Sequence, residues 1–334
     1  MVAKIRDVAR LAGVSSGTVS RVIHNNGYVS RRTKRKVLDA IEKLNYRPHA
    51  VAARLVSGKT HIIGLLVPDL HESYYVEITE AIIEMARKSG YSILLTTTHK
   101  EKSHLPDFLR SGNMDGLLVI TPYYIEEELS IMTDRDIPCV LINYAAEGQK
   151  CSSVYCDQFK VGYLATQYLI ESGHTRIGLC TSDTNSPSPM KRLQGSLQAL
   201  ADAKLGIQGT YIRDMSQKLH KNPVKEVRTW IQEGDLPEAL FVFSDDIALY
   251  VMAALQEAGY KIPDDISVIG CGNMLFSERT IPPLTTVDQN MCILGAESFK
   301  MLVRHIEQKN VDAYEVKVIE PRLVLRESCR DRDV

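Results

Sequence analysis

From His61 onward the sequence alternates short, continuously apolar runs with longer amphipathic stretches, and this alternation restricts the fold more than any other feature. A strand that is apolar at successive positions is buried on both faces, as in parallel sheets that helices cover on each side. The sequence therefore predicts a parallel, helix-covered α/β body. Its predicted strands include the runs 62–67, 93–97, 116–120, 139–142, 177–180, 240–243 and 266–270.

The first 46 residues have a different pattern, in which apolar residues recur at helical spacing. They predict three short helices: one starting near Ile5, a second after Ser15 and a third after Ser30, with a sharp turn at Gly13 between the first two. The predicted organisation is an all-α domain at 1–46, a hinge and linker at 47–60, and the α/β body at 61–334.

Charge is distributed unevenly along the chain, although the total is only −1. Residues 1–60 hold 13 Lys/Arg against 3 Asp/Glu, a surplus of +10, which leaves 27 against 38, or −11, for the rest. Because the basic residues lie on periodic helical sequence rather than in a disordered tail, they favour nucleic-acid binding by the first domain.

The 44% apolar and 24% charged residues are typical of a globular protein, and 334 residues suffice for two or three folded units. There is no apolar run of 18 residues and no apolar stretch at the N-terminus of the kind that a secretory signal needs, so we expect a cytoplasmic protein. The seven cysteines form no C-x-x-C and are expected to be reduced core residues.

Motifs that would indicate an enzyme are absent from the sequence. It has no G-x-x-x-x-G-K-[ST], no G-x-G-x-x-G at the first βα unit and no G-x-S-x-G, and its nine histidines are scattered without metal-ligand spacing. We therefore expect neither catalysis nor a metal or cofactor site.

Residues 5–22, IRDVARLAGVSSGTVSRV, closely resemble the helix-turn-helix of the lactose-repressor (LacI/GalR) family. The resemblance continues in the family's order at 45–48 (NYRP), 63–69 (IGLLVPD), 173–177 (GHTRI), 263–270 (PDDISVIG) and 282–287 (PPLTTV). It implies a helix-turn-helix headpiece and a two-lobed body of the periplasmic-binding-protein type (type I). The lobes would comprise about 61–159 with 288–320, and about 160–287 with 321–334.

The resemblance implies that the second helix enters the major groove of operator DNA. Ser16, Gly17 and Arg21 match the base-reading positions, and an arginine suits a bidentate guanine contact worth roughly 1–3 kcal/mol. His24 lies on the same predicted face. The residues better placed for phosphate contacts are Ser15, Thr18, Ser20 and Asn25. For Ser15, ordinary helix capping is an alternative role.

Residues 50–55, AVAARL, resemble the family's hinge helix, which pairs with its dimer mate in the minor groove. Ala52 and Leu55 are the expected contacts, with Leu55 matching the leucine inserted between central base pairs. Such a wedge unstacks one step at a cost of a few kcal/mol and bends the duplex around more protein. The family's usual arginine stands one position before Arg54, where this chain has Ala53.

The body is expected to bind a small effector between its lobes, beyond the carboxyl ends of the strands. Tyr74 and Tyr75 match positions where some family members hold aromatic rings against the ligand, with core packing as the alternative. The other candidates, at positions where the family has cleft residues, are Asp157, Arg192, Ser244, Asp245 and Asn273. A guanidinium such as that of Arg192 offers five donors to hydroxyls or anions.

The body departs from the family pattern at three places. Ser244 stands where sugar-binding members usually have Asn, and residues 270–273 (GCGN) replace the usual paired aspartates. This loss of acceptor charge favours a neutral or anionic effector, such as a sugar or sugar derivative. The segment 98–115 is about one helical turn shorter than usual.

The mechanism that the resemblance implies is a homodimer reading a pseudo-palindromic operator, most simply as a repressor. An effector would change the angle between the lobes and thereby the spacing of the headpieces; a coupling of about 1–3 kcal/mol suffices for such a switch. The alternatives are a phosphorylated carrier protein as co-effector, a vestigial cleft and a solute-binding protein, the last opposed by the basic headpiece.

Overall fold

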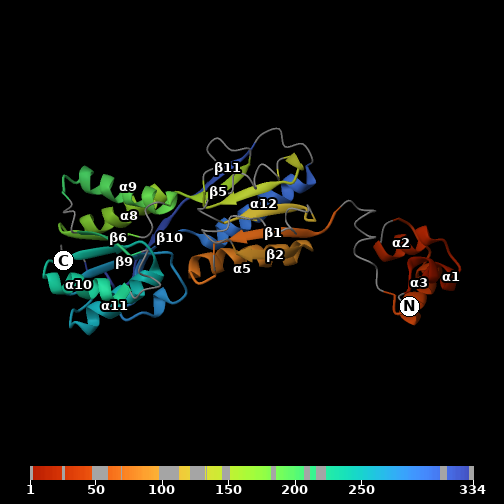
Figure 1. The fold of residues 1–334 in the computed structure, drawn as a ribbon, viewed down its shortest axis with the longest axis horizontal. Helices are drawn as coiled ribbons and strands as arrows, with labels where there is room; N and C mark the ends of the chain where they lie inside the picture. The colour runs from red at the N-terminus through yellow and green to blue at the C-terminus, as the bar shows by residue number, and fades with distance from the viewer. Residues whose placement is uncertain are drawn as a thin grey trace. The chain divides into compact units, whose positions relative to one another are not determined.

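The computed structural model describes residues 3–24, 27–46, 59–68, 70–97, 113–120, 132, 134–144, 151–181, 186–206, 211–215, 223–308 and 314–330. The chain divides into two compact units, Met1–Thr60 and His61–Val334. Figure 1 shows the three helices of the first unit and the strands and helices of the second.

The first unit is a three-helix headpiece formed by α1 (Ile5–Ala12), α2 (Ser16–His24) and α3 (Arg31–Lys43). Gly13 ends α1 with a φ of 65°, the left-handed conformation that glycine adopts without a Cβ penalty. Ser30 caps α3 by accepting a bond from the Thr33 backbone N–H. The buried core is small, and its members are Val8, Ala9, Ala12, Val19, Val22, Val37 and Ala40.

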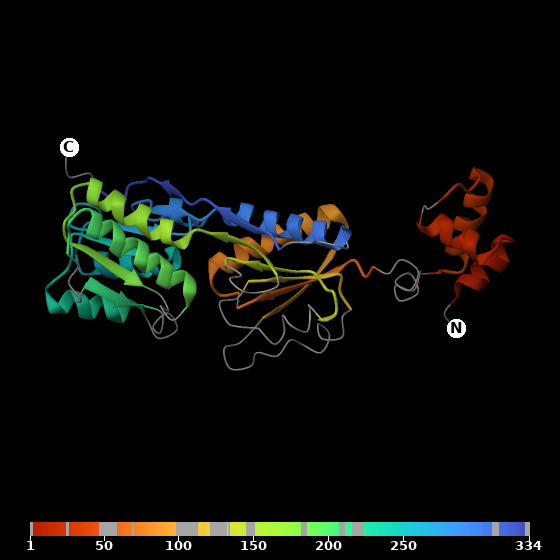
Figure 2. The same cartoon turned by 90° about the horizontal axis from the view of Figure 1, so that it is seen from above.

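The second unit contains two lobes, each built on one sheet (Figure 1). The first lobe's described sheet has the strand order β11-β5-β4-β3-β1-β2, all parallel. Its strands are β1 (Ile62–Val67), β2 (Ser92–Thr97), β3 (Gly116–Val119), β4 (Cys139–Ile142), β5 (Ser152–Cys156) and β11 (Val316–Ile319). Helices α5 (Ser73–Ser89) and α12 (Met291–Glu307) pack together on one face of this sheet (Figure 2).

The second lobe's described sheet has the order β12-β10-β9-β8-β6-β7, in which only β12 is antiparallel to its neighbour. Its strands are β6 (Ile177–Thr181), β7 (Ile212–Asp214), β8 (Ala239–Val242), β9 (Ser267–Cys271), β10 (Thr285–Asp288) and β12 (Arg322–Val324). Helices α8 (Gln158–Glu171) and α9 (Pro187–Asp202) lie on one side of it, and α10 (Pro223–Glu233) and α11 (Asp245–Glu257) on the other (Figure 1). The short helix η3 (Ser277–Arg279) precedes β10.

The chain passes between the lobes three times within the described residues: from β5 to α8, from β10 to α12 and from β11 to β12. Hydrogen bonds tie these crossings together. The Asp157 backbone N–H donates to the Ile319 carbonyl at 3.4 Å, and Asn290 Nδ2 donates to the Glu320 carbonyl at 2.8 Å. The expected two-lobed, parallel-sheet body is therefore confirmed.

The cysteines are free thiols, as expected, but not all of them lie in the core. Cys292, near the start of α12, is exposed, so the prediction of a core residue is wrong there. An apolar neighbourhood in sequence does not decide which face of a helix a residue occupies. No helix among the described residues is long and apolar enough to span a bilayer.

Candidate DNA-binding and effector-binding sites

The predicted DNA-reading residues lie along α2 and the turn before it. Val19 and Val22 are buried in the headpiece core, which turns Gly17 and Arg21 to solvent and leaves Ser16 and Ser20 partly exposed. A helix with small residues at its amino end and an exposed arginine one turn later brings backbone and guanidinium to the same surface. That surface suits the edges of bases in a major groove.

Ser15 caps the start of α2, which is the alternative role predicted for it from the sequence. Its hydroxyl accepts a bond from the Thr18 backbone N–H at 3.2 Å and pairs with the Thr18 hydroxyl at 3.0 Å. Both side chains retain exposed area, so capping does not exclude a phosphate contact. His24 is the last residue of α2, whereas Asn25, Ala52 and Leu55 lie outside the described residues.

Tyr74 and Tyr75 stand in the first turn of α5, with their rings packed edge to face at a centroid distance of 5.4 Å. The Tyr74 hydroxyl is buried and has no hydrogen-bond partner among the described residues, although the residue as a whole is only partly buried. Burial raises its pKa well above the usual value; the thiols of Cys156 and Cys271 act in the same direction, and the Arg192 guanidinium acts against them. Tyr74 is thus a neutral donor close to Arg192.

Arg192, on α9, is buried to 6% exposure and is held by neighbours from several elements. Its Nε donates to Gln158 Oε1 at 3.2 Å, its Nη1 to the Phe243 carbonyl, and the guanidinium carbon lies 5.5 Å from the centre of the Phe243 ring. Because these partners fix the plane of the guanidinium, its direction is set before any further group binds.

Gln158 and Gln289 extend this arrangement across the crossings between the lobes. Gln158 Nε2 donates to Asn143 Oδ1 at 3.1 Å and to Gln289 Oε1 at 2.8 Å, and Gln289 Nε2 donates to Cys271 Sγ at 3.2 Å. Asn143 follows β4 of the first lobe, whereas Arg192 and Cys271 belong to the second. This network, defined by Asn143, Gln158, Arg192, Cys271 and Gln289, joins both lobes.

Asp245 is fully buried at the start of α11 and accepts three hydrogen bonds from its own lobe. The donors are the Met274 backbone N–H at 3.0 Å, the Ser277 hydroxyl at 2.6 Å and the Thr286 hydroxyl at 2.7 Å. Burial raises the pKa of its carboxyl, and these hydrogen bonds partly offset the rise. Asp245 therefore holds the segment after β9 in place.

Because Gly270 has no side chain, the Asp245 carboxylate can lie directly against its backbone. A Cβ added at Gly270 would lie 2.1 Å from Asp245 Oδ1 and 2.9 Å from a Leu284 methyl carbon. The glycine of the family-like run 263–270 thus makes room for a carboxylate supplied by a different element.

The remaining candidates are also held by protein groups. Asp157 caps α8 by accepting a bond from the Lys160 backbone N–H at 3.0 Å. The Asn273 side chain donates to Asp288 at 3.1 Å and accepts from Arg326 at 2.6 Å, beside the crossings. Ser244 precedes α11 as its N-cap residue; burial raises the pKa of the neighbouring Asp246, and the Ser244 hydroxyl acts against this rise.

The Arg192 guanidinium thus lies within electrostatic range of the Tyr74 hydroxyl. Asp157, Asp245 and Asn273 each have well-defined partners of their own. Sequence reasoning missed Gln158, Gln289, Cys156 and Cys271, which surround the Tyr74–Arg192 pair. All four lie at the ends of strands or in the crossings, so the rule that ligands bind beyond strand ends would have found them.

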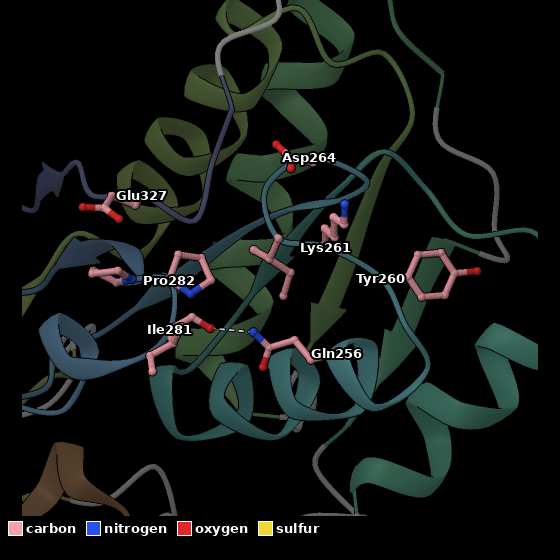
Figure 3. A pocket seen from close by; sticks show the side chains of 9 residues that line it. Gln256, Tyr260, Lys261, Asp264, Ile281, Pro282 and Glu327 are labelled. Carbon is pink, nitrogen blue, oxygen red and sulfur yellow. Dashed lines mark hydrogen bonds between the residues drawn. The ribbon is translucent and has the colours of Figure 1, made fainter.

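An open surface pocket of about 580 Å³ lies elsewhere in the second lobe. Figure 3 shows Gln256, Lys261, Ile281 and Pro282 around it, with Gln256 Nε2 donating to the Ile281 carbonyl at 2.5 Å. None of the predicted site residues lines this pocket. Among the described residues, no cluster of three His, Cys, Asp or Glu side chains is arranged to hold a metal ion.

A three-helix headpiece with an exposed reading helix, joined in one chain to a two-lobed body, defines a class of ligand-regulated DNA-binding proteins. Comparison with known proteins agrees. Residues 4–49 match "Bacterial regulatory proteins, lacI family", and residues 166–329 match "Periplasmic binding protein-like domain".

Relatives that span the whole chain make the assignment firm. The chain is 35% identical to the HTH-type transcriptional repressor PurR of Histophilus somni (strain 129Pt), over 98% of this chain and 99% of that protein. It is equally identical, over the same shares, to PurR of Actinobacillus pleuropneumoniae serotype 3 (strain JL03). The chain belongs to the lacI family of bacterial regulatory proteins; it is a DNA-binding transcription regulator and not an enzyme.

Two solved structures have the same fold over nearly all of the chain. The lac repressor dimer bound to operator and the anti-inducer ONPF has a TM-score of 0.86 and 26% identity, covering 99% of this chain and all of that one. The transcriptional regulator CelR in complex with cellobiose has a TM-score of 0.72 and 27% identity, covering 98% and 99%. The first is a DNA-bound dimer and the second holds a sugar.

Proposed function

We propose that this protein is a homodimeric, cytoplasmic transcription repressor whose affinity for a pseudo-palindromic operator is switched by a small effector bound between its lobes. The observation that carries the proposal is the presence, in one chain, of an exposed reading helix and of the Tyr74–Arg192 pair at the junction of two lobes. Repressor relatives and the operator-bound, dimeric lac repressor support the same conclusion.

In the headpiece, Ser16, Gly17 and Arg21 would read bases, with His24 on the same predicted face of the helix. The residues that would contact the backbone of the duplex are Ser15, Thr18, Ser20 and Asn25. The hinge at 47–60 would follow, with Leu55 as a wedge in the minor groove beside Ala52. The surplus of ten positive charges in residues 1–60 would supply the non-specific part of the affinity.

In the body, the effector would be a small ring compound, such as a sugar or sugar derivative. Tyr74 and Tyr75 offer aromatic faces, the Tyr74 hydroxyl offers a buried donor, and Arg192 offers a fixed guanidinium. Asp157, Ser244, Asp245 and Asn273 would shape the site from the second lobe. A ligand that contacts both sides of the network would change the angle between the lobes and hence the spacing of the headpieces.

The headpiece role is tested by enriching random duplex DNA on the purified full-length protein. We expect a palindromic motif whose half-sites lie about one helical turn apart. Arg21→Ala should relax the preference at one position of each half-site, and Leu55→Ala should weaken binding without changing the motif. Arg87→Ala, an exposed arginine on α5 of the body, is the matched control and should leave both unchanged. Enrichment of no motif would contradict the proposal.

The effector role is tested by thermal unfolding in the presence of sugars, sugar phosphates and purine bases. A ligand at 100 times its Kd stabilises the native state by about 2.7 kcal/mol, a readily measured shift. A compound that raises the Tm of the protein, but not that of Tyr74→Ala and Arg192→Gln, would identify the effector class. A compound that stabilises all three proteins equally binds elsewhere.

A further inference from the structure

The two lobes contact each other at the amino end of α5. There the Ser73 hydroxyl donates a 2.7 Å hydrogen bond to Asp246 Oδ1, although the two residues are 173 positions apart in the sequence. Ser73 is the first residue of α5 in the first lobe, and Asp246 is the second residue of α11 in the other. This bond therefore exists only when the lobes are close together.

Helix α5 lacks a cap of its own. Its N-cap residue, Glu72, makes no side-chain capping bond, and the first turn contains no acidic residue. A helix begins with backbone N–H groups that have no partner within the helix, and a nearby carboxylate satisfies them and suits the positive end of the dipole. The Asp246 carboxylate stands where such a group is needed, but it comes from the opposite lobe.

The environment of Asp246 fits this role. Burial raises the pKa of its carboxyl, and the Ser73 hydroxyl and the Ser73 backbone N–H lower it as hydrogen-bond donors. The Ser73 backbone N–H is one of the N–H groups at the start of α5 that have no partner within the helix. Asp246 therefore accepts from the Ser73 hydroxyl and lies beside the main-chain N–H of the residue that opens α5.

Further along the same helix, residues of the second lobe contact side chains of α5. Glu77, one turn further along α5, faces the second lobe. Burial and the Asp288 carboxylate raise the pKa of its carboxyl, and the Leu275 backbone N–H acts against this rise. The neighbouring Met274 is buried in the first lobe's core together with Ile78 and Ile82. The segment that Asp245 holds is thus the one that packs against α5.

We propose that Asp246 is a positioning residue that caps α5 from the opposite lobe and so fixes the first turn, which carries Tyr74 and Tyr75. Closure of the lobes and ordering of Tyr74 and Tyr75 are then coupled, because the first turn of α5 in one lobe is capped only when Asp246 of the other lobe reaches it. The significance of the aromatic pair rests on the proposed effector function, but the cap itself does not.

The test is hydrogen–deuterium exchange of the full-length protein, read by mass spectrometry on peptides that cover the first turn of α5. Loss of a cap weakens the first turn of a helix, so Asp246→Ala should accelerate exchange there about five- to tenfold. Asp246→Asn should restore most of the protection, because asparagine is an equally good cap. Glu257→Ala, which removes an exposed carboxylate at the far end of α11, is the matched control.

Peptides of α12 provide the reference for global stability. Faster exchange in the first turn of α5, without a change in α12 and with recovery in Asp246→Asn, supports the cap. Unchanged exchange in Asp246→Ala, or equal acceleration of both helices in Asp246→Ala and Asp246→Asn, overturns it. The measurement uses neither DNA nor effector, so its failure is distinct from a failure of the proposed function.

Discussion

At the scale of single residues, the second lobe depends on the Asp245 carboxylate, which occupies the space that a side chain at Gly270 would need. Asp245 accepts bonds from Met274, Ser277 and Thr286 and lies against the bare Cα of Gly270. Two predictions follow from this pairing, one steric and one electrostatic.

The steric prediction concerns Gly270→Ala. A methyl group 2.1 Å from Asp245 Oδ1 forces the buried carboxylate away from its donors, so the free energy of unfolding should fall by about 2–4 kcal/mol. Urea denaturation measures the loss, and Gly206→Ala, where an added Cβ meets open space, should be nearly neutral. In a double-mutant cycle with Asp245→Ala, the loss in the double mutant should be smaller than the sum of the two single losses by about 1–3 kcal/mol. Additive losses would contradict the shared-space explanation.

The electrostatic prediction concerns Asp245→Asn. Burial raises the pKa of Asp245 in the native state above its usual 3.8, so the native state binds the proton more tightly than the unfolded state. This carboxyl therefore favours folding most at low pH, and its contribution falls as the pH rises from about 4 through the native pKa. Compared with wild type, Asp245→Asn should gain relative stability as the pH rises from about 4 through the native pKa of Asp245 in urea titrations. A constant difference would show that the native pKa is not raised.

At the scale of elements, α8 and α9 pack with their backbones in contact, because each helix has a glycine at the point of closest approach. An added Cβ at Gly162 would lie 1.9 Å from the Arg192 carbonyl, and one at Gly195 would lie 1.9 Å from the Phe159 carbonyl. The close approach fixes the position of α9 and therefore of Arg192.

Replacing Gly195 by alanine should separate these helices. Alanine favours a helix by about 0.5–1 kcal/mol, but overpacking against a carbonyl costs about 1–3 kcal/mol, so a net loss of stability is expected. Thermal denaturation measures the loss, and the Tm shift of any effector should also shrink because Arg192 moves. An unchanged effector response in a destabilised Gly195→Ala protein would show that Arg192 does not depend on this contact.

The strands predicted from the sequence were those with continuous apolar runs, and all seven are present as β1, β2, β3, β4, β6, β8 and β9. Five described strands were not predicted: β5, β7, β10, β11 and β12. Strands β5 and β10 lack a continuous apolar run because they contain Ser152, Ser153, Thr285 and Thr286, which are fully buried. The partner of Ser152 is the Glu315 backbone, 163 residues away, and that of Thr286 is Asp245. Local patterns do not reveal such distant partners.

The same limit applies to the site. Tyr74 and Arg192 were recognised because they match a family pattern, and the structure places them close together. Gln158 and Gln289 bond to each other across 131 residues, and Ser73 and Asp246 across 173, so neither pair has a local signature.

At the scale of the whole molecule, charge divides as the domains do, with +10 in residues 1–60 and −11 in the remainder. Helix α3 concentrates this surplus, because Arg31, Arg32, Lys34, Arg35 and Lys36 are exposed and the first turn holds no acidic residue. Cations at the positive end of a helix are unfavourable for the headpiece alone. A polyanionic partner explains why they are there.

Replacing Arg31, Arg32 and Arg35 together by glutamine should weaken binding to operator and to unrelated DNA by the same factor. If each arginine neutralises a phosphate, the slope of log affinity against log salt should become shallower by about 0.9 per residue. Fluorescence anisotropy at several salt concentrations measures both quantities. A change in base preference would instead place these residues at the base edges.

The contact between Asp245 and Gly270 also bears on how such chains diverge. A side chain at 270 and a carboxylate at 245 exclude each other, so neither position is free to drift while the other stays as it is. A lineage that acquires a side chain at 270 must first give up the aspartate at 245, and with it the anchor of Met274. Substitutions at these two sites should therefore occur as correlated pairs, in a fixed order, among descendants of this protein.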